Sequence, residues 1–372
     1  MNVLNIGTDK TLVGGRKLGD AIQRHRRYGE FLDHLDIIVY ANKKEGLNKF
    51  KISDKVFGYP TNSKSKSHFF FDAKKIFEKI NQDHKIDIIV CQDPFIPGLI
   101  GVCLKKKYGF KLQINFHGDF WQNSAWLKER WLNIFFLLIS KFTVPRADLI
   151  RVMSEGQKEK LIRAGVKENK IKVISVPVDL DKYQGSEIRD QKLKIVLHVG
   201  RDDKVKDYNT LVRAFKLVKE KNPGAIFWQV GANKEIKAAM KKNSFSDIAV
   251  IGFKDDKALL PLFTQSAVFV SSSASESFGK VLVEANACGK PVVSTATTGA
   301  KEIIQDGVNG FLVPIGDAKA LADKIIYLLN NPDKAKEMGE NGRLLVKEKY
   351  GDNTQKIISA WQELMGEKKN AY

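Results

Sequence analysis

The feature that most constrains the fold is a regular alternation of short apolar runs with longer segments of helical periodicity. In the first half of the chain the apolar runs are 2–6, 36–40, 86–91, 112–116 and 149–152. The helix-length segments between them are 17–32, 71–81, 97–108 and 124–142. Short runs rich in β-branched residues are typical of strands that are buried on both faces of a parallel sheet. The alternation therefore predicts a doubly wound α/β domain.

The second half of the chain repeats this pattern. We expect strands at 195–200, 225–230, 248–251, 267–271 and 291–294, and helices at 208–221, 257–265, 279–288, 318–329, 339–349 and 354–365. A chain of 372 residues is long for one compact core and sufficient for two domains. We predict an N-terminal Rossmann-like domain over 1–177 and a C-terminal one over 178–352. Residues 353–372 form a C-terminal helix and tail, and their crossing back to the first domain is left open.

The charge and the cysteine content limit the cellular compartment and the binding partners that we expect for this protein. Residues 1–177 carry 32 Lys and Arg against 18 Asp and Glu, whereas residues 178–372 carry 30 against 25. Either this excess is a solvated lysine-rich surface, or the first half approaches an anionic membrane surface or a phosphate-bearing acceptor. No nucleic-acid-binding motif is present, so we expect no nucleic acid partner. Three scattered cysteines favour a reducing compartment and fit no metal site.

The N-terminus has no charged leader followed by an apolar run, so we expect no signal peptide. No apolar stretch approaches the roughly 18–20 residues that a membrane-spanning helix needs. We therefore expect a cytoplasmic protein, either soluble or peripheral on the cytoplasmic face of the membrane.

The stretch ESFGKVLVE, residues 276–284, places two glutamates on either side of a predicted helix start. Gly279 permits close approach of a ligand to the backbone, and the first amides of a helix favour a phosphate group. Glu276 and Glu284 would repel a phosphate, but both could accept hydrogen bonds from hydroxyls on either side of a diphosphate. A nucleotide sugar has that layout. The alternative is that both are surface glutamates of an ordinary amphipathic helix.

A second motif, HVGRDDKVKDYN, follows the apolar run at 195–200. Arg201 and Lys206 could converge on one anion at the carboxyl end of that strand, because Arg offers a two-pronged grip and Lys a point charge. The alternative is a polar turn with two solvated cations.

Taken together and in order, these motifs resemble the family-4 retaining glycosyltransferases of the GT-B fold. The matching segments are GRDDKVKDYNTLVRAF, GFKDD at 252–256, SESFGKVLVEANACGKPVVST and GAKEIIQDGVNGFLVPIGDAKALADKI, which cover most of residues 195–330. The first half matches more loosely, at Gly14-Gly15, FHGDF and PRADLIRVMSEGQKEKLIRAGV. Where relatives often have Gly-Gly before Glu302, this chain has Thr298-Gly299.

The resemblance implies two Rossmann-like domains that face each other across a cleft, with a nucleotide-diphosphate sugar bound mainly by the second. It implies that Arg201 and Lys206 stabilise the departing diphosphate, that Glu276 contacts the transferred sugar and that Glu284 holds the ribose. No metal and no cofactor are implied, because the cations and the helix N-terminus take that part. Four further positions would approach the diphosphate through their backbone: Phe278, Gly279, Lys280 and Val281.

The first half supplies further candidates by the same resemblance. His117 ends a predicted strand and would lie near the donor sugar and the reacting centre, with Asp119 orienting it or touching the acceptor. Gly14 and Gly15 would bring backbone close to the donor, and Arg16 would contact the acceptor. In the second half, Lys254 would flank the base.

The implied reaction transfers a sugar to an acceptor hydroxyl with retention of the anomeric configuration, as an EC 2.4 enzyme. The basic first half favours a lipid-linked glycan, a glycolipid or a cell-surface polysaccharide precursor as acceptor. Two alternatives stay open: a nucleotide-sugar epimerase of the same fold, and a non-catalytic subunit that binds nucleotide sugars. The aromatic residues Trp121, Trp126, Trp131, Phe135 and Phe136, together with 69–71, either pack on the sheet or form a membrane-interfacial surface.

Overall fold

The computed structural model describes residues 1–372 except 16–19, 184–192, 253, 255 and 367–372, and leaves out the side chains of 125, 129, 256 and 257. Backbone contacts divide the chain into two compact units. Unit 1 consists of Met1–Ile174 together with the segment that begins at Asn353, and unit 2 consists of Ser175–Asp352. The C-terminal helix α14 (Thr354–Met365) therefore belongs to the unit that contains the N-terminus.

Unit 1 is built around one sheet in the order β3-β4-β2-β1-β5-β6-β7-β8, in which only β3 runs antiparallel to its neighbour. The strands are β1 (Asn2–Gly7), β2 (His34–Val39), β3 (Phe50–Ser53), β4 (Val56–Pro60), β5 (Ile88–Cys91), β6 (Lys111–Phe116), β7 (Leu149–Val152) and β8 (Ile171–Val173). The helices are α1 (Ala21–Glu30), α2 (Phe69–Asp83), α3 (Ile96–Tyr108), α4 (Ser124–Glu129), α5 (Leu132–Thr143), α6 (Glu155–Arg163) and α14. The predicted parallel α/β architecture is confirmed for this half of the chain.

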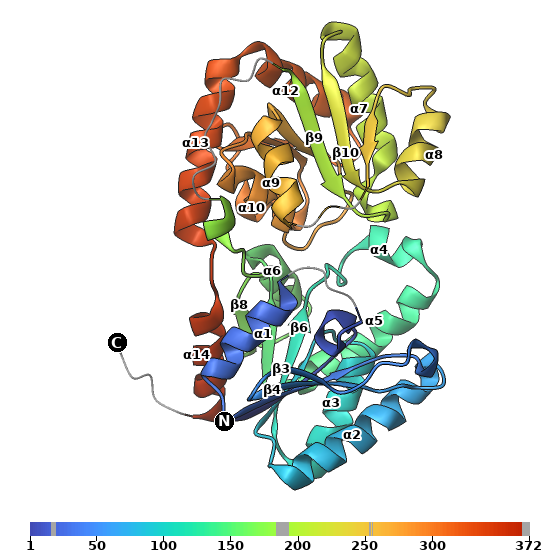
Figure 1. Cartoon of the computed structure of the whole chain (residues 1–372), viewed down its shortest axis with the longest axis vertical. Helices are drawn as coiled ribbons and strands as arrows, with labels where there is room; N and C mark the ends of the chain where they lie inside the picture. Colours follow the sequence, from blue (N-terminus) through green and yellow to red (C-terminus); the bar gives the residue numbers. More distant parts are fainter. Residues whose placement is uncertain (16–19, 184–192, 253, 255, 367–372) are drawn as a thin grey trace. The chain divides into compact units, whose positions relative to one another are not determined.

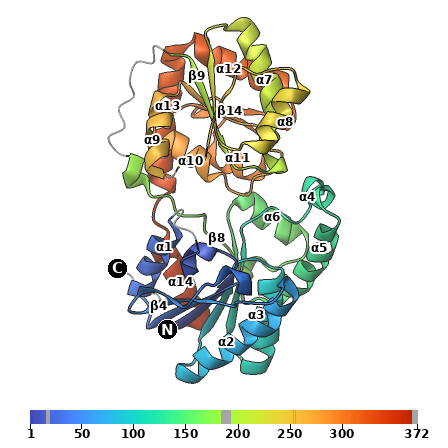
Figure 2. The same ribbon diagram turned by 45° about the vertical axis from the view of Figure 1, so that its right-hand side comes forward.

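Both faces of this sheet are covered by helices, which explains why its strands read as nearly continuous apolar runs. Side chains of β1, β2 and β5 pack with α1 and α14 in one buried cluster, in which Tyr28 and Trp361 meet edge to face. A second cluster joins the opposite face to α2 and α3 and includes Phe77 and Leu104. Figures 1 and 2 show α1 and α14 side by side and α2 and α3 on the other side of the strands.

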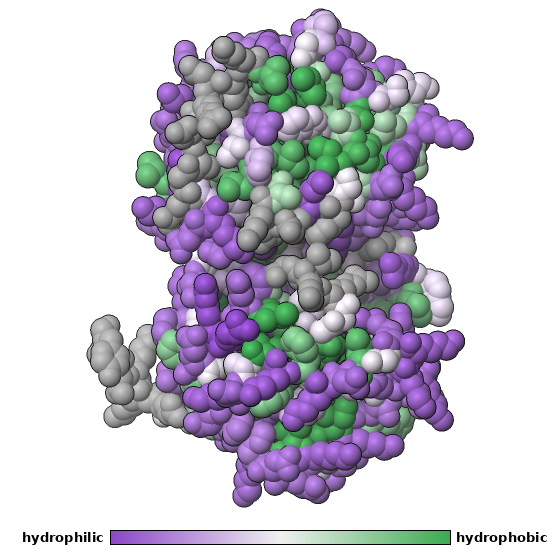
Figure 3. All heavy atoms as spheres, in the orientation of Figure 1, coloured by the Kyte–Doolittle hydropathy of each residue, from purple (hydrophilic) through white to green (hydrophobic). Residues whose placement is uncertain are grey.

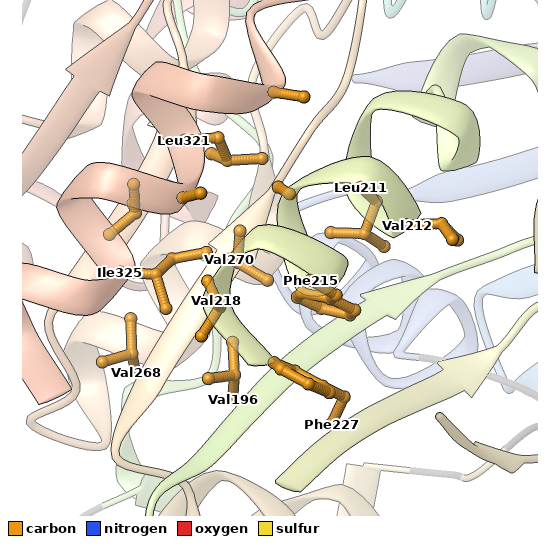
Figure 4. Close-up of a cluster of buried hydrophobic side chains, with 14 of the residues drawn as sticks. Val196, Leu211, Val212, Phe215, Val218, Phe227, Val268, Val270, Leu321 and Ile325 are labelled. Carbon is orange, nitrogen blue, oxygen red and sulfur yellow. The ribbon is translucent and has the colours of Figure 1, made fainter. Parts of the chain in front are cut away.

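Unit 2 contains an all-parallel sheet in the order β11-β10-β9-β12-β13-β14. Its strands are β9 (Ile195–Gly200), β10 (Ile226–Gly231), β11 (Ala249–Ile251), β12 (Val268–Ser271), β13 (Val292–Thr295) and β14 (Gly310–Val313). Its helices are α7 (Tyr208–Lys221), α8 (Lys234–Lys242), α9 (Asp256–Gln265), α10 (Lys280–Ala287), α11 (Thr298–Ile303), α12 (Ala318–Asn330) and α13 (Pro332–Lys349). Phe215 of α7 stacks on Phe227 of β10 in the core, and Ile325 of α12 lies in the same cluster (Figure 4).

Residues 124–142 form two helices rather than the single helix that we expected. Arg130 is extended (φ −148°, ψ 136°) and ends α4, and Trp131 leads into α5. The Asn133 side chain donates a hydrogen bond of 2.6 Å to the carbonyl of Trp126, which supplies a partner for the end of α4. This bond stabilises the break, which apolar periodicity alone does not reveal.

No helix among the described residues is long and apolar enough to cross a membrane. Within the same residues, no group of three or more His, Cys, Asp or Glu side chains is arranged to hold a metal ion.

Candidate active site

The loop between β12 and α10 has a shape that depends on Gly279. Gly279 has φ +91°, a conformation that a residue with a Cβ rarely adopts, and α10 begins at the next residue. The amides of Lys280 and Val281 belong to the first turn, where backbone N–H groups have no acceptor within the helix. This loop therefore presents donors at the carboxyl end of the sheet, where ligands of open α/β sheets bind.

Gly299 of α11 holds this loop in place, and sequence reasoning missed its role. Its amide donates a hydrogen bond of 2.8 Å to the carbonyl of Glu276. A Cβ at Gly299 would lie only 2.4 Å from the carbonyl oxygen of Phe278, so only glycine permits this packing. The Phe278 ring is buried against Tyr350, with ring centroids 5.4 Å apart. The loop backbone is thus fixed from both sides.

Lys206 and Glu276 form an ion pair, with 2.6 Å between Lys206 Nζ and Glu276 Oε2. Their side chains are 13% and 25% exposed. Lys206 ends the short 3-10 helix η7 (Lys204–Lys206), which is capped by Asp203. The Ser272 hydroxyl donates to the Lys206 carbonyl at 2.7 Å, and the Ala274 amide donates to the carbonyl of Val205. These bonds attach η7 to the loop before α10, so two motifs that are distant in sequence meet.

Arg201 follows β9 but has a different environment. Its side chain is 80% exposed, and its Nη2 lies 3.2 Å from Asp203 Oδ2. The Arg201 carbonyl accepts a hydrogen bond of 2.8 Å from the hydroxyl of Tyr208, which fixes the backbone and leaves the guanidinium on the surface. Convergence of Arg201 with Lys206 on one anion stays a prediction.

Glu284 lies in the second turn of α10, and its side chain is only 5% exposed. Its Oε1 is 3.4 Å from Nζ of Lys280, one turn earlier. Burial distinguishes this residue from a solvated surface glutamate, because a buried carboxylate requires hydrogen-bonding or charged partners. Lys254, in contrast, is exposed, and its two neighbours lie outside the described residues.

The remaining candidates belong to unit 1. Gly14 has φ +75° and ends the 3-10 helix η1 (Lys10–Val13), and the Gly15 amide donates to the Lys10 carbonyl at 2.9 Å. Both glycines are exposed in the loop after β1. Arg16 lies outside the described residues.

His117 follows β6 directly, and its Nε2 lies 3.0 Å from Oε1 of Gln92, a residue that sequence reasoning missed. Desolvation by surrounding protein atoms, followed by the charges of Arg151 and Arg24, lowers the pKa of His117. Asp119 forms an ion pair of 2.6 Å with Lys160 of α6.

Two family models together match most of the chain, from residue 32 to residue 345. Residues 32–182 match Glycosyltransferase Family 4, and residues 180–345 match Glycosyl transferases group 1. Among curated proteins, the capsular polysaccharide biosynthesis glycosyltransferase CapM of Staphylococcus aureus is 30% identical over 244 residues, which are 61% of this chain and 63% of that protein.

Solved structures agree on the fold. Sucrose-phosphate synthase from Thermosynechococcus elongatus superposes with a TM-score of 0.82 at 21% identity, over 99% of this chain and all of that one. The Anabaena HepE protein, solved with UDP-glucose, has a TM-score of 0.75 at 20% identity, over 98% and 99% of the two chains. From its two family matches and its two parallel α/β units, we conclude that this chain belongs to the family-4 (group 1) glycosyltransferases and is a nucleotide-sugar glycosyltransferase of the GT-B fold.

Proposed function

We propose that the protein moves a hexose or a related sugar from a nucleotide diphosphate to an acceptor hydroxyl, with retention of the anomeric configuration and without a metal. The observation that carries this proposal is the ion pair of Lys206 and Glu276 beside the first turn of α10. A cation, a carboxylate and a set of backbone amides are the groups that a sugar diphosphate requires, and unit 2 contains all three within one loop system.

Each group has a part that follows from its charge. The Lys206 ammonium and the first amides of α10 would stabilise the negative charge that grows on the diphosphate as the glycosidic bond breaks. Glu276 would accept a hydrogen bond from a sugar hydroxyl. Arg201 would leave its pairing with Asp203 for the phosphates at little cost, because exposed ion pairs contribute only about 0–1 kcal/mol.

Glu284 would hold the ribose hydroxyls. Its buried carboxylate lies on the helix whose first turn would meet the diphosphate, so the two contacts are spaced along one rigid element. Such preorganisation lowers the entropic cost of binding the donor.

For the acceptor, we propose a lipid-linked glycan, a glycolipid or a polysaccharide precursor at the cytoplasmic face of an anionic membrane. An exposed apolar stripe on unit 1 supports this. The stripe follows one side of α5 and consists of Trp131, Ile134, Phe135, Leu138 and Phe142. Trp131 is 80% exposed, which is unusual for the largest apolar side chain. In Figure 2, α5 lies at the right-hand edge of unit 1.

The stripe is bordered by cations, which selects an anionic lipid surface as its occupant. Lys128, Arg130 and Lys141 are exposed around α5, and the guanidinium of Arg146 lies 3.8 Å from the Phe142 ring centroid. Lys, Arg and Trp side chains suit the headgroup region of a bilayer. Hydrophilic residues cover much of the face drawn in Figure 3, between several apolar areas.

The other aromatic residues of this region pack inside unit 1. Trp121 is buried and donates to the Ser140 hydroxyl at 2.8 Å, and Trp126 stacks on Phe95 with ring centroids 5.9 Å apart. In the segment 69–71, for which the sequence left the same two interpretations open, Phe69 is buried and Phe71 is exposed. Packing inside unit 1 therefore accounts for Trp121 and Trp126, and the membrane-interfacial interpretation remains our proposal for the exposed members of the set.

A donor panel followed by product analysis tests the proposal. We expect one UDP-, GDP- or ADP-sugar to raise the melting temperature, because ligands that bind only the folded state stabilise it. With that donor and a polyprenyl-diphosphate sugar, NMR of the product should show the anomeric configuration of the donor. An inverted product, or no transfer to any hydroxyl acceptor, would contradict the proposal. Turnover of the donor alone to an epimer would instead support the epimerase alternative.

A further inference from the structure

A row of polar side chains runs through the otherwise apolar sheet of unit 1. Gln113, Asn115 and His117 occupy alternate positions along and just after β6, so they point to the same face of the sheet. Gln113 and Asn115 are each 2% exposed. Buried amide groups are almost always hydrogen-bonded, so the partners of this row determine which way each amide points.

The row forms one continuous chain of hydrogen bonds that begins at the C-terminal helix. Trp361 Nε1 of α14 donates to Gln113 Oε1 at 2.7 Å, and Gln113 Nε2 donates to Asn115 Oδ1 at 2.7 Å. Asn115 Nδ2 then donates to Gln92 Oε1 at 3.2 Å. The same Gln92 oxygen lies 3.0 Å from Nε2 of His117.

The direction of every bond in this chain follows from its first member. An indole nitrogen only donates, so Gln113 must present its oxygen to Trp361 and its NH₂ group to Asn115. By the same reasoning Asn115 presents its oxygen to Gln113 and its NH₂ group to Gln92. Gln92 then presents an oxygen to His117, and that oxygen can only accept.

We propose that Trp361, acting through Gln113, Asn115 and Gln92, sets the tautomer of His117, with the proton on Nε2 and with Nδ1 as the hydrogen-bond acceptor. The four side chains are positioning residues, because they act on His117 and not on a ligand. Trp361 and Gln113 are 248 residues apart in sequence, and His117 and Gln92 are 25 residues apart. This row of hydrogen bonds therefore exists only in the folded unit.

The backbone of the neighbouring strand leaves space for the Gln92 side chain. Gln92 directly follows β5, and Gly7 ends the neighbouring β1. A Cβ at Gly7 would lie 2.8 Å from Gln92 Cγ, so glycine at that position makes room for the glutamine side chain. Asn115 is paired in register with Arg151 of β7. The charge of Arg151 opposes protonation of His117.

Two other histidines carry the opposite tautomer and provide a reference within the same molecule. His25 Nδ1 lies 2.8 Å from the Ala21 carbonyl, which can only accept, and its Nε2 lies 3.1 Å from Asn5 Nδ2. His198 Nδ1 faces Gln229 Oε1, while Gln229 Nε2 donates to the Val230 carbonyl. Both rings therefore have the proton on Nδ1 when neutral.

The functional meaning of this tautomer rests on the transfer proposed above. A His117 ring with Nδ1 as acceptor would receive a hydrogen bond from a sugar hydroxyl and could not donate one to it. The tautomer itself is a property of unit 1 and can be measured without donor or acceptor.

Nitrogen-15 NMR of the histidine-labelled full-length protein at neutral pH tests the proposal. We expect a pyrrole-type signal from Nε2 of His117 and from Nδ1 of His25 and His198, each assigned by its own His→Asn variant. In Gln92→Glu the new carboxylate should favour the charged ring and raise the titration midpoint of His117 by on the order of 1–3 pH units.

In Trp361→Phe the fixed donor is lost, the amides can reverse, and a second His117 signal with the proton on Nδ1 should appear. Trp131→Phe is the matched control and should leave His117 unchanged. The proposal fails if wild-type His117 carries its proton on Nδ1, or if neither variant changes its signals. Failure of sugar transfer with the expected spectra would instead contradict the proposed function and leave the tautomer in place.

Discussion

Lys206 and Glu276 are 70 residues apart in sequence and in direct contact in the fold, with Nζ and Oε2 separated by 2.6 Å. Without a donor, each neutralises the other. A nucleotide sugar would offer Lys206 a phosphate and Glu276 a hydroxyl, so binding exchanges one internal pair for two external contacts. The ion pair therefore keeps both side chains aimed at the place where the donor is proposed to bind.

Replacing Lys206 tests this arrangement directly. We expect Lys206→Ala to lower kcat by about 10²–10³-fold, the usual loss when one stabilising donor is removed from a transition-state site. Lys204→Ala is the matched control, since Lys204 is on the same short helix η7 and is exposed. Steady-state transfer assays of both variants provide the measurement. Equal activity of the two would remove Lys206 from the proposed mechanism.

Glu284→Gln should weaken donor binding more than it slows chemistry. Hydrogen bonds to a charged group contribute about 1.5–3 kcal/mol, so we expect a loss of roughly tenfold or more in affinity for the nucleotide diphosphate. Titration calorimetry with the free nucleotide measures this, and Glu340→Gln at an exposed position of α13 is the control. An unchanged dissociation constant would argue against the ribose contact.

Gly299→Ala should distort the loop before α10, because the new Cβ would collide with the backbone of Phe278. Overpacking of this kind costs typically about 1–3 kcal/mol of stability. Gly224→Ala is the control, because no atom lies within 4 Å of a Cβ there. Gly299→Ala should lower both the stability measured by urea unfolding and the affinity for the donor. Gly224→Ala should change neither. Retention of full affinity in Gly299→Ala would show that the loop is not held by this contact.

The apolar stripe on α5 predicts binding to anionic vesicles. Wild-type protein should sediment with phosphatidylglycerol vesicles but not with phosphatidylcholine vesicles, and salt should weaken the binding. The double variant Trp131→Ser, Phe135→Ser should lose it, whereas Leu344→Ser, at an exposed apolar residue of unit 2, should not. Salt-insensitive binding, or equal binding by the double variant, would exclude this surface as the membrane contact.

Acid should destabilise unit 2 through His198. Burial away from water, partly offset by the bond to Gln229 and reinforced by the charge of Lys206, lowers the pKa of His198 from 6.5 to about 3. The unfolded chain therefore binds a proton below pH 6.5 that the folded chain does not, and stability falls by about 1.4 kcal/mol per pH unit between these limits.

Urea unfolding at pH 7.5 and at pH 5, followed by tryptophan fluorescence, measures this loss. Between the two, wild-type protein should lose roughly 2 kcal/mol more than His198→Asn. At pH 7.5 the His198 ring is neutral in both states, so that value serves as the baseline. Parallel losses in the two proteins would mean that His198 is not a neutral buried group.

The alternation of apolar runs was sufficient to predict two parallel α/β units, because strands buried on both faces leave an unambiguous pattern. The β3–β4 hairpin was missed, since β3 is a four-residue edge strand with Lys51 and Ser53, and β4 is short and contains Gly58 and Pro60. The break at Arg130 was also missed, because it depends on one side-chain bond from Asn133.

The candidate site shows the same division. Local motifs predicted Glu276, Glu284 and Lys206 as site residues, but the contact between Lys206 and Glu276 joins separate parts of the chain and is visible only in the fold. Gln92 carries no motif, and the motif that contains Gly299 does not reveal its contact with the loop before α10. A signal for the polar row did exist, since Gln113, Asn115 and His117 alternate with apolar residues in a strand that otherwise reads as fully buried.

The membership of α14 in unit 1 has a consequence for biosynthesis. Unit 2 is encoded between the two parts of unit 1, so a ribosome releases all of unit 2 before it releases Trp361. Until then Gln113 lacks its indole donor, and the amides between it and His117 have no imposed direction. Unit 2 can therefore be complete before the bond between Trp361 and Gln113, on which the proposed tautomer of His117 rests, is able to form.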